Sequence, residues 1–299
     1  MKPVISCCLP LLLLLPAPAP AARWSDPEIV GLVTRAEVDE ISGLAASHTL
    51  PGHWWAINDS GNAAALALLG EDGQYLGRAP APVPNRDWED LASFELDGRP
   101  YLLVADTGDN GGLRRELSLY VLEEPASLEQ APRLAWTVNF RWPDGPRDCE
   151  AVAVDPVRGE VLLVSKKRVP PELFRVPLRA EGLQVAELLG SLQGIPQPTA
   201  EDLARNPVYG RYRAQVTAAD LSPDGRTLVV LTYRAVHYLQ RGRDEAWPQA
   251  LSRPLHALAM PWMPQAEAAA FSVDGEELWI GSEQLPSPFL RYRLEKSGN

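Results

Sequence analysis

Five short segments of this chain share a pattern whose third residue carries a carboxyl or hydroxyl group. Each segment reads polar, any residue, oxygen-bearing residue, small residue, apolar residue, with Asp90 once in the small position. The five third positions are Ser42, Glu89, Glu150, Thr217 and Glu267. Three carboxylates brought into one site repel one another unless their pKa values rise or a cation neutralises them. An oxygen-only set of side chains is typical of Ca²⁺ ligands. We therefore expect a Ca²⁺ site, with a water-filled acidic channel as the alternative.

Further polar clusters follow a hydrophobic strand in each repeat. Three aspartates in them, Asp59, Asp106 and Asp109, are candidates for orienting a water molecule in catalysis. The candidate substrate-binding residues from the same clusters are Asn58, Asn110, Lys166, Lys167, Tyr233 and Arg234. The chain has no G-x-S-x-G, H-E-x-x-H or P-loop motif, and its four histidines show no zinc-ligand spacing. A hydrolase built on these residues would therefore depend on the metal ion.

The spacing of the pattern indicates which elements must position these side chains. The third positions lie 47, 61, 67 and 50 residues apart, and each is followed by a turn and a hydrophobic strand. Such a period is typical of β-propeller blades, with longer gaps for loop insertions. We predict an all-β, five-bladed propeller of four-stranded blades, each pattern starting an inner strand, so that the polar residues meet at one mouth of the central channel. The alternative to a functional site is that the Gly, Asp and Asn residues at these positions only form turns.

The ends of the chain complete this prediction. Fourth strands are expected at 75–79, 134–140, 183–189 and 254–258, and the fifth repeat ends before a fourth strand appears. The strand 28–33 precedes the first repeat, so we expect it to close the ring by joining the last blade. A sixth blade within 191–214 is the alternative, although the Pro-rich sequence there favours a long loop.

Four of the segments resemble the inner-strand motifs of soluble calcium-activated nucleotidases (apyrases). They are 40–44 (EISGL), 87–91 (DWEDL), 148–152 (DCEAV) and 265–269 (QAEAA). That family is a five-bladed propeller that binds Ca²⁺ in its channel through inner-strand Glu and Ser side chains. The resemblance implies the same role for Ser42, Glu89, Glu150, Thr217 and Glu267. The wider pattern, with 58–61 (NDSG), 106–110 (DTGDN) and 216–220 (VTAAD), is similar to exported bacterial propellers of unsettled function.

Composition and the first residues bear on location and partners. Residues 1–22 have the charged start, apolar run and small-residue cleavage site of a signal peptide, so we expect a periplasmic or secreted propeller over 23–299. Lys and Arg number 28 against 39 Asp and Glu, a net charge of −11, which argues against nucleic-acid binding. After the signal, no apolar run is long enough to span a membrane.

Two functions remain open at this point. One is a metal-dependent hydrolase of phosphorylated or ester substrates, acting as a monomer on a small anionic substrate. The other is a non-catalytic propeller of the cell envelope that binds a ligand or another envelope protein through the loop 191–214, where Tyr209 and Tyr212 are candidate contacts.

Overall fold

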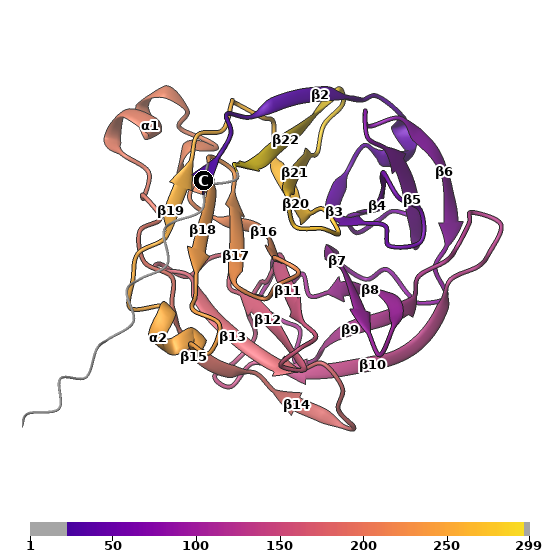
Figure 1. Ribbon diagram of the computed structural model, residues 1–299. Coiled ribbons are helices and arrows are strands. Elements are labelled where there is room, and N and C mark those ends of the chain that lie inside the picture. The colour runs from indigo at the N-terminus through magenta and orange to yellow at the C-terminus, as the bar shows by residue number, and fades with distance from the viewer. Residues whose placement is uncertain (1–22, 296–299) are drawn as a thin grey trace, which may run out of the picture.

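The computed structural model of this protein describes residues 23–295, so the expected signal peptide lies outside the described residues. Five sheets, in which nearly all neighbouring strands are antiparallel, are arranged around a central axis like the blades of a propeller (Figure 1). The inner strands contact one another in a closed ring, since that of the last blade also packs against that of the first. The five-bladed propeller predicted from the sequence is confirmed.

The blades follow the order of the chain. Blade 1 consists of β3 (Ile41–Ala46), β4 (His53–Asn58), β5 (Ala65–Gly70) and β6 (Tyr75–Pro80). Blade 2 consists of β7 (Trp88–Leu96), β8 (Arg99–Asp106), β9 (Leu117–Glu123) and β10 (Arg133–Arg141), with β14 (Leu183–Val185) at its edge. Blade 3 consists of β11 (Ala151–Asp155), β12 (Glu160–Val164), β13 (Glu172–Pro177) and β15 (Glu187–Ser191). Blade 4 consists of β16 (Val216–Leu221), β17 (Thr227–Thr232), β18 (Val236–Gln240) and β19 (His256–Leu258). Blade 5 contains β20 (Ala266–Phe271), β21 (Glu277–Ser282) and β22 (Ser287–Glu295).

The N-terminal strands close the ring, as the sequence predicted. Both β1 (Arg23–Trp24) and β2 (Glu28–Val33) pair antiparallel with β22, and β2 lies beside it in Figure 1. Aromatic rings fill the joint between the last blade and the first, because Trp54 of blade 1 and Phe289 of blade 5 each lie 4.9 Å from Trp279, measured between ring centroids. The closure therefore hides the edge of β22 and buries large apolar side chains together.

Short helices lie in the connections. They are η1 (Ala36–Val38), α1 (Ala200–Arg205), η2 (Gly210–Tyr212) and α2 (Trp247–Ala250). The segment 191–214, which the alternative of six blades required to form a sheet, instead holds α1 and η2 between blades 3 and 4. No helix among residues 23–295 has the length and apolar character needed to cross a membrane.

One predicted strand needs correction. The stretch 183–189 was expected to be a single fourth strand of blade 3, but its first part, β14, pairs in parallel with β10 of blade 2. Only β15 pairs with β13 and completes blade 3. Ala186 separates the two strands: its side chain is buried in the apolar core between blades 2 and 3, and its N–H donates to the Arg141 carbonyl. The chain thus passes from blade 2 to blade 3 at Ala186. The hydrophobic pattern of 183–189 does not mark this residue as a break between two strands.

The repeated pattern has a common backbone cause. In four inner strands the ladder shifts by one residue, which leaves one residue unpaired opposite the second strand. The four unpaired residues are Ser42, Glu89, Thr217 and Glu267. In blade 3, Glu150 immediately precedes β11. These irregularities are β-bulges, which redirect a side chain out of the regular alternation of a strand.

Candidate metal centre and adjoining cavity

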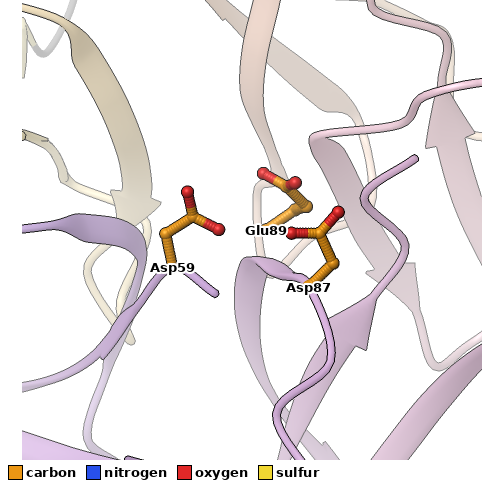
Figure 2. Close-up of side chains that lie close together, drawn as sticks. All are labelled: Asp59, Asp87 and Glu89. Carbon is orange, nitrogen blue, oxygen red and sulfur yellow. The ribbon is translucent and has the colours of Figure 1, made fainter. Parts of the chain in front are cut away.

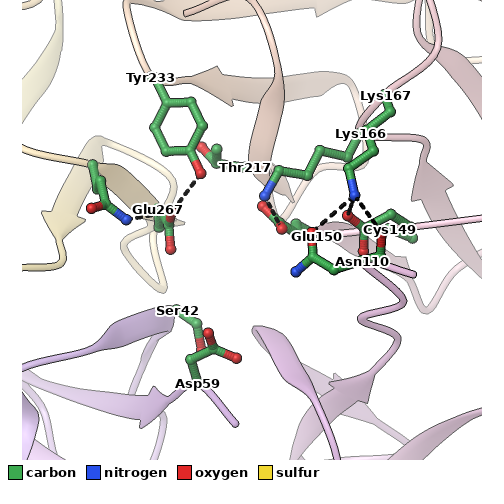
Figure 3. Close-up of polar contacts among 12 residues, drawn as sticks. Ser42, Asp59, Asn110, Cys149, Glu150, Lys166, Lys167, Thr217, Tyr233 and Glu267 are labelled. Carbon is green, nitrogen blue, oxygen red and sulfur yellow. Dashed lines mark hydrogen bonds and ion pairs between the residues drawn. The ribbon is translucent and has the colours of Figure 1, made fainter. Parts of the chain in front are cut away.

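The five third-position residues lie at one mouth of the channel. In every blade the first residue of the inner strand pairs with a residue at the end of the second strand, as Ile41 does with Asn58. The mouth is therefore formed where inner strands begin and second strands end, which Figure 3 shows for several of these side chains. All five residues are buried, Glu267 being the most exposed at 8%.

Carboxylates from blades 1, 2 and 3 converge in two overlapping groups. Asp59, Asp87 and Glu89 form one group and Glu89, Asp148 and Glu150 form the other, and within each group one oxygen of every residue lies within 4.8 Å of the others. Figure 2 shows Asp59, after β4, facing Asp87 and Glu89 at the start of β7. Glu89 belongs to both groups and is the centre of the cluster.

Sequence reasoning did not select two of these five residues. Asp87 and Asp148 hold the first position of the repeated pattern, two residues before Glu89 and Glu150. The signal was present, because a carboxyl group recurs at that position in three successive blades, as Glu40, Asp87 and Asp148. In blade 2 the bulge takes Glu89 out of the regular alternation of β7, and in blade 3 Glu150 occupies the corresponding position just before β11.

Glu89 is the residue whose charge is least compensated. It is 5% exposed, and among residues 23–295 no donor forms a hydrogen bond or ion pair with its carboxylate. Burial raises its pKa well above the usual range, and the nearby carboxylates of Glu150, Asp59 and Asp87 raise it further. Burial likewise raises the pKa of Asp59 and of Asp87. The group therefore either holds protons or requires a cation.

A glycine gives these carboxylates their space. The N–H of Gly108 donates to the Asp87 carbonyl at 3.2 Å, and this hydrogen bond holds the loop after β8 close to the cluster. A Cβ atom at Gly108 would lie 2.1 Å from Oε1 of Glu89 and 2.4 Å from Oδ2 of Asp87. The space around these carboxylates therefore depends on the absence of a side chain at position 108.

The metal-ligand atoms that the cluster offers are all carboxylate oxygens, which suit a hard divalent cation.

The other carboxylates of the mouth have partners. Lys166 forms a buried ion pair with Glu150, and although burial opposes its charge, this partner raises the pKa of Lys166. Lys167 lies 2.8 Å from Asp148. The hydroxyl of Tyr233 donates to Glu267 at 2.7 Å, as Figure 3 shows. Lys166 and Lys167 thus compensate the charges of Glu150 and Asp148, whereas no cation among residues 23–295 forms an ion pair with Asp59, Asp87 or Glu89.

Blade 5 adds one more carboxyl group that sequence reasoning missed. Burial, together with the neighbouring Glu267, raises the pKa of Glu283 to about 10, and the amide of Gln265 donates to Glu283 at 2.5 Å. Glu283 directly follows β21, and nothing in the repeated pattern distinguishes it.

The three candidate catalytic aspartates occupy different surroundings. Asp59 belongs to the cluster, with its carboxylate half-buried and facing Asp87. Asp106 is fully buried and accepts from Arg114 at 2.6 Å. Asp109 accepts backbone N–H groups from Leu113 at 2.7 Å and Arg114 at 3.0 Å. Asp106 and Asp109 therefore shape the loop that carries Gly108, and only Asp59 faces the acidic groups.

The two hydroxyl residues of the pattern join neighbouring blades. Ser42 donates to the carbonyl of Trp88 at 3.0 Å, and Thr217 donates to the carbonyl of Ala266 at 2.7 Å. In each case the acceptor immediately precedes the third-position glutamate of the next blade. Ser42, Thr217 and Glu267 do not belong to the two acidic groups, so their expected role as metal ligands stays a prediction.

A cavity of about 750 Å³ opens beside the acidic cluster, over blades 3 to 5. Four of the six candidate substrate-binding residues line it: Asn110, Lys166, Lys167 and Tyr233. The remaining two make other contacts, since Asn58 donates to the Glu37 carbonyl at 3.1 Å and Arg234 lies 3.0 Å from Asp202. One wall comes from the α1–η2 segment, whose Tyr209 and Tyr212 the sequence had suggested as contacts.

Comparisons with known proteins identify no family for this chain. No protein-family model matches it, and no curated protein matches it. A chain of the crystal structure of a nidogen/laminin complex is 14% identical with a TM-score of 0.42, covering 81% of this chain and 72% of that one. The WD40 repeats of RRP9 are 12% identical with a TM-score of 0.39, covering 85% and 67%. Such distant likenesses carry no information about activity, and the resemblance to calcium-activated nucleotidases remains a prediction.

Proposed function

We propose that this protein is an exported, Ca²⁺-dependent hydrolase of phosphorylated or ester substrates. The observation that carries the proposal is Glu89, a buried carboxylate that has no hydrogen-bond donor among residues 23–295 and that is shared by two acidic groups. Asp59, Asp87, Glu89, Asp148 and Glu150 would hold the cation. When bound, Ca²⁺ would supply polarisation of a phosphoryl or ester oxygen.

Asp59 is the residue that we propose to orient and deprotonate the attacking water. Its carboxylate is half-buried and faces Asp87 and Glu89, which places it beside the proposed cation. It is the only candidate catalytic aspartate that faces the cluster, because Asp106 and Asp109 are occupied by Arg114 and backbone N–H groups. A carboxylate in this position can accept the proton of a water molecule.

Lys166 is the residue that we propose to hold the anionic group of the substrate. An ammonium group has three N–H donors, and in the described part of the chain the ammonium of Lys166 donates a hydrogen bond only to Glu150. Lys167, in contrast, contacts Asp148 and both oxygens of Asn110. Lys166 also lines the cavity, so it can contact a substrate oxygen without losing its carboxylate partner.

The proposal is tested by a screen with Ca²⁺ of nucleotides, phosphomonoesters, phosphodiesters, phytate and simple esters. We expect turnover of at least one class, and a loss of about 100-fold or more in Asp59→Asn and Glu89→Gln. Asp97→Asn is the matched control, because Asp97 lies in the exposed turn after β7, at the opposite end of the strand that carries Glu89. No turnover by the wild type, or turnover that both site variants retain, would contradict the hydrolase.

A non-catalytic binding propeller is the second candidate function, and the exposed aromatic residues of the cavity favour it. Trp262 is 80% exposed and Tyr209 is 67% exposed, and both line the same cavity, so a ligand bound there would remove both rings from water. This candidate needs no metal and predicts a ligand that binds without being changed.

A further inference from the structure

The cavity beside the acidic cluster has a composition of its own. It is lined by the aromatic residues Tyr209, Tyr212, Tyr233 and Trp262 and by the amide residues Asn110, Asn206, Gln215, Gln265 and Gln284. Its volume of about 750 Å³ lies within the range of roughly 300–1,000 Å³ typical of small-molecule sites. None of the five carboxylates of the acidic groups lines it. The cavity is therefore a neighbouring site and not the metal centre itself.

The charges that line the cavity are already paired. Lys166 pairs with Glu150, Lys167 lies 2.8 Å from Asp148, and Arg213 lies 2.9 Å from Asp202. Three cations with three carboxylate partners leave no excess of either charge over most of the surface. A polyanion would compete with these ion pairs, whereas Lys166 can accommodate one ligand oxygen beside Glu150. A ligand that is uncharged over most of its surface therefore suits the cavity.

The aromatic residues provide apolar faces at the rim. The rings of Trp262 and Tyr209 are mostly exposed, so a ligand that covers them removes apolar surface from water. The polar tips of both side chains stay available for hydrogen bonds at the same time. A ligand with C–H faces and polar edges matches both properties.

The amide residues provide the polar contacts. Each amide offers two N–H donors and a carbonyl acceptor, which is the combination that a hydroxyl group, itself a donor and an acceptor, requires. Within residues 23–295 the side chain of Gln215 makes no hydrogen bond, and that of Asn206 accepts only from the N–H of Tyr209 at 3.0 Å. These groups are therefore available to a ligand rich in hydroxyls.

The wall that carries Tyr209 and Tyr212 is fixed in place by one carboxylate. Asp202 caps α1 through Thr199 and pairs with Arg213 of the same segment and Arg234 of blade 4. The hydrogen bonds from Thr199, aided by both arginines, lower the pKa of Asp202 to about 2. A preformed wall reduces the ordering cost of binding.

We infer that this cavity binds a carbohydrate, a neutral saccharide of about two or three rings whose C–H faces cover Trp262 and Tyr209 and whose hydroxyls contact the amides. The inference deepens the proposed function by naming the substrate class. It rests on that function for one point only, namely that the acidic cluster cleaves an ester group on the bound saccharide. Saccharide binding itself requires no turnover and also fits the non-catalytic candidate.

The test is a calorimetric titration with neutral oligosaccharides, using maltotriose, cellotriose and tri-N-acetylchitotriose as first probes and a neutral glycan array as the wider set. We expect at least one saccharide to bind. Trp262→Ala and Tyr209→Ala should each weaken binding about tenfold, which corresponds to ~1.4 kcal/mol. Trp262→Phe keeps an aromatic face and should retain most of the affinity.

Two controls make the result decisive. Val157→Ala removes an equally exposed apolar side chain from the turn after β11, away from the cavity, and should leave binding unchanged. Glu89→Gln should abolish hydrolysis but preserve saccharide binding, which separates failure of the hydrolase from failure of the carbohydrate site. Absence of binding across the array, or binding that survives Trp262→Ala and Tyr209→Ala, would overturn the inference, as would tighter binding of a flat aromatic compound such as free adenosine.

Discussion

Glu89 and Asp90 are neighbours on β7, are both buried, and have opposite surroundings. Asp90 is fully buried, and its carboxylate accepts backbone N–H groups from Leu91 at 2.9 Å, Val152 at 2.8 Å and Ala219 at 3.2 Å. It therefore joins the inner strands of blades 2, 3 and 4. Glu89 has no donor among the described residues and faces other carboxylates. Burial raises the pKa of both groups.

Asp220 of blade 4 repeats the arrangement of Asp90. Its carboxylate accepts from the N–H of Leu221 and from that of Phe271 in blade 5, both at 2.8 Å. The buried carboxylates that join the blades are thus surrounded by N–H groups, whereas Glu89 at the mouth is surrounded by other carboxylates. The presence or absence of donors, more than burial itself, separates structural carboxylates from those of a candidate site.

The largest effect is expected at Asp90. Asp90→Ala leaves N–H groups of three blades without an acceptor inside the core, so we expect a loss of about 3–5 kcal/mol in the free energy of unfolding. Chemical denaturation monitored by circular dichroism measures it. Asp90→Asn keeps one carbonyl acceptor and should cost clearly less. An alanine variant with wild-type stability would show that the three hydrogen bonds do not hold the blades together.

A pH effect of about 1–3 kcal/mol is expected from Asp220. Burial raises its pKa to about 7 in the folded protein, against about 3.9 in an unfolded chain. The folded state therefore binds more protons between these values, and the stability contribution present below pH ~4 is lost as pH rises through ~7. Urea denaturation at pH 5 and pH 8 should show this loss, and Asp220→Asn should reduce it. An equal pH dependence in wild type and variant would contradict the assignment.

Gly108→Ala tests the space around Glu89. The added Cβ would lie 2.1 Å from Oε1 of Glu89, so the carboxylates must move, at a cost of about 1–3 kcal/mol. We expect Ca²⁺ binding, measured by calorimetry, to weaken about tenfold or more. Gly111→Ala is the control in the same loop, because its Cβ would meet only the Leu113 side chain at 3.3 Å. Equal Ca²⁺ affinity in both variants would argue against a cation beside Glu89.

The smallest effect is expected at Thr217. Its hydroxyl donates to the carbonyl of Ala266 in the next blade, so Thr217→Val should cost about 1 kcal/mol and Thr217→Ser should recover most of it. Since Thr217 lies outside the acidic groups, Ca²⁺ should stabilise the valine variant as much as the wild type in thermal melts. Loss of the Ca²⁺ effect would make Thr217 a ligand, as the sequence had suggested.

The sequence predicts the ring and its mouth because both depend on a repeated local pattern. The five inner strands, the closing strand and the burial of the third positions follow from it. The contents of the site depend on contacts between blades, which no single repeat contains. Asp87 and Asp148 become part of the cluster only where blades 1, 2 and 3 meet, whereas the carboxylates of Asp106 and Asp109 accept hydrogen bonds from Arg114 and from backbone N–H groups. The cavity depends on how the irregular segment around α1 folds against blade 4 through Asp202, which periodicity cannot show.

The central claim is that a cation compensates the charge around Glu89, and thermal melting with and without Ca²⁺ tests it most directly. Ca²⁺ at about 100 times its Kd should stabilise the wild type by ~2.7 kcal/mol, a rise in Tm of about 5 °C for a chain of this size; a chelator should reverse it. Glu89→Gln should raise the metal-free Tm and abolish the response to Ca²⁺, while Asp97→Asn should respond like the wild type. A wild-type Tm that neither Ca²⁺ nor chelator changes, or a full Ca²⁺ response in Glu89→Gln, would contradict the account.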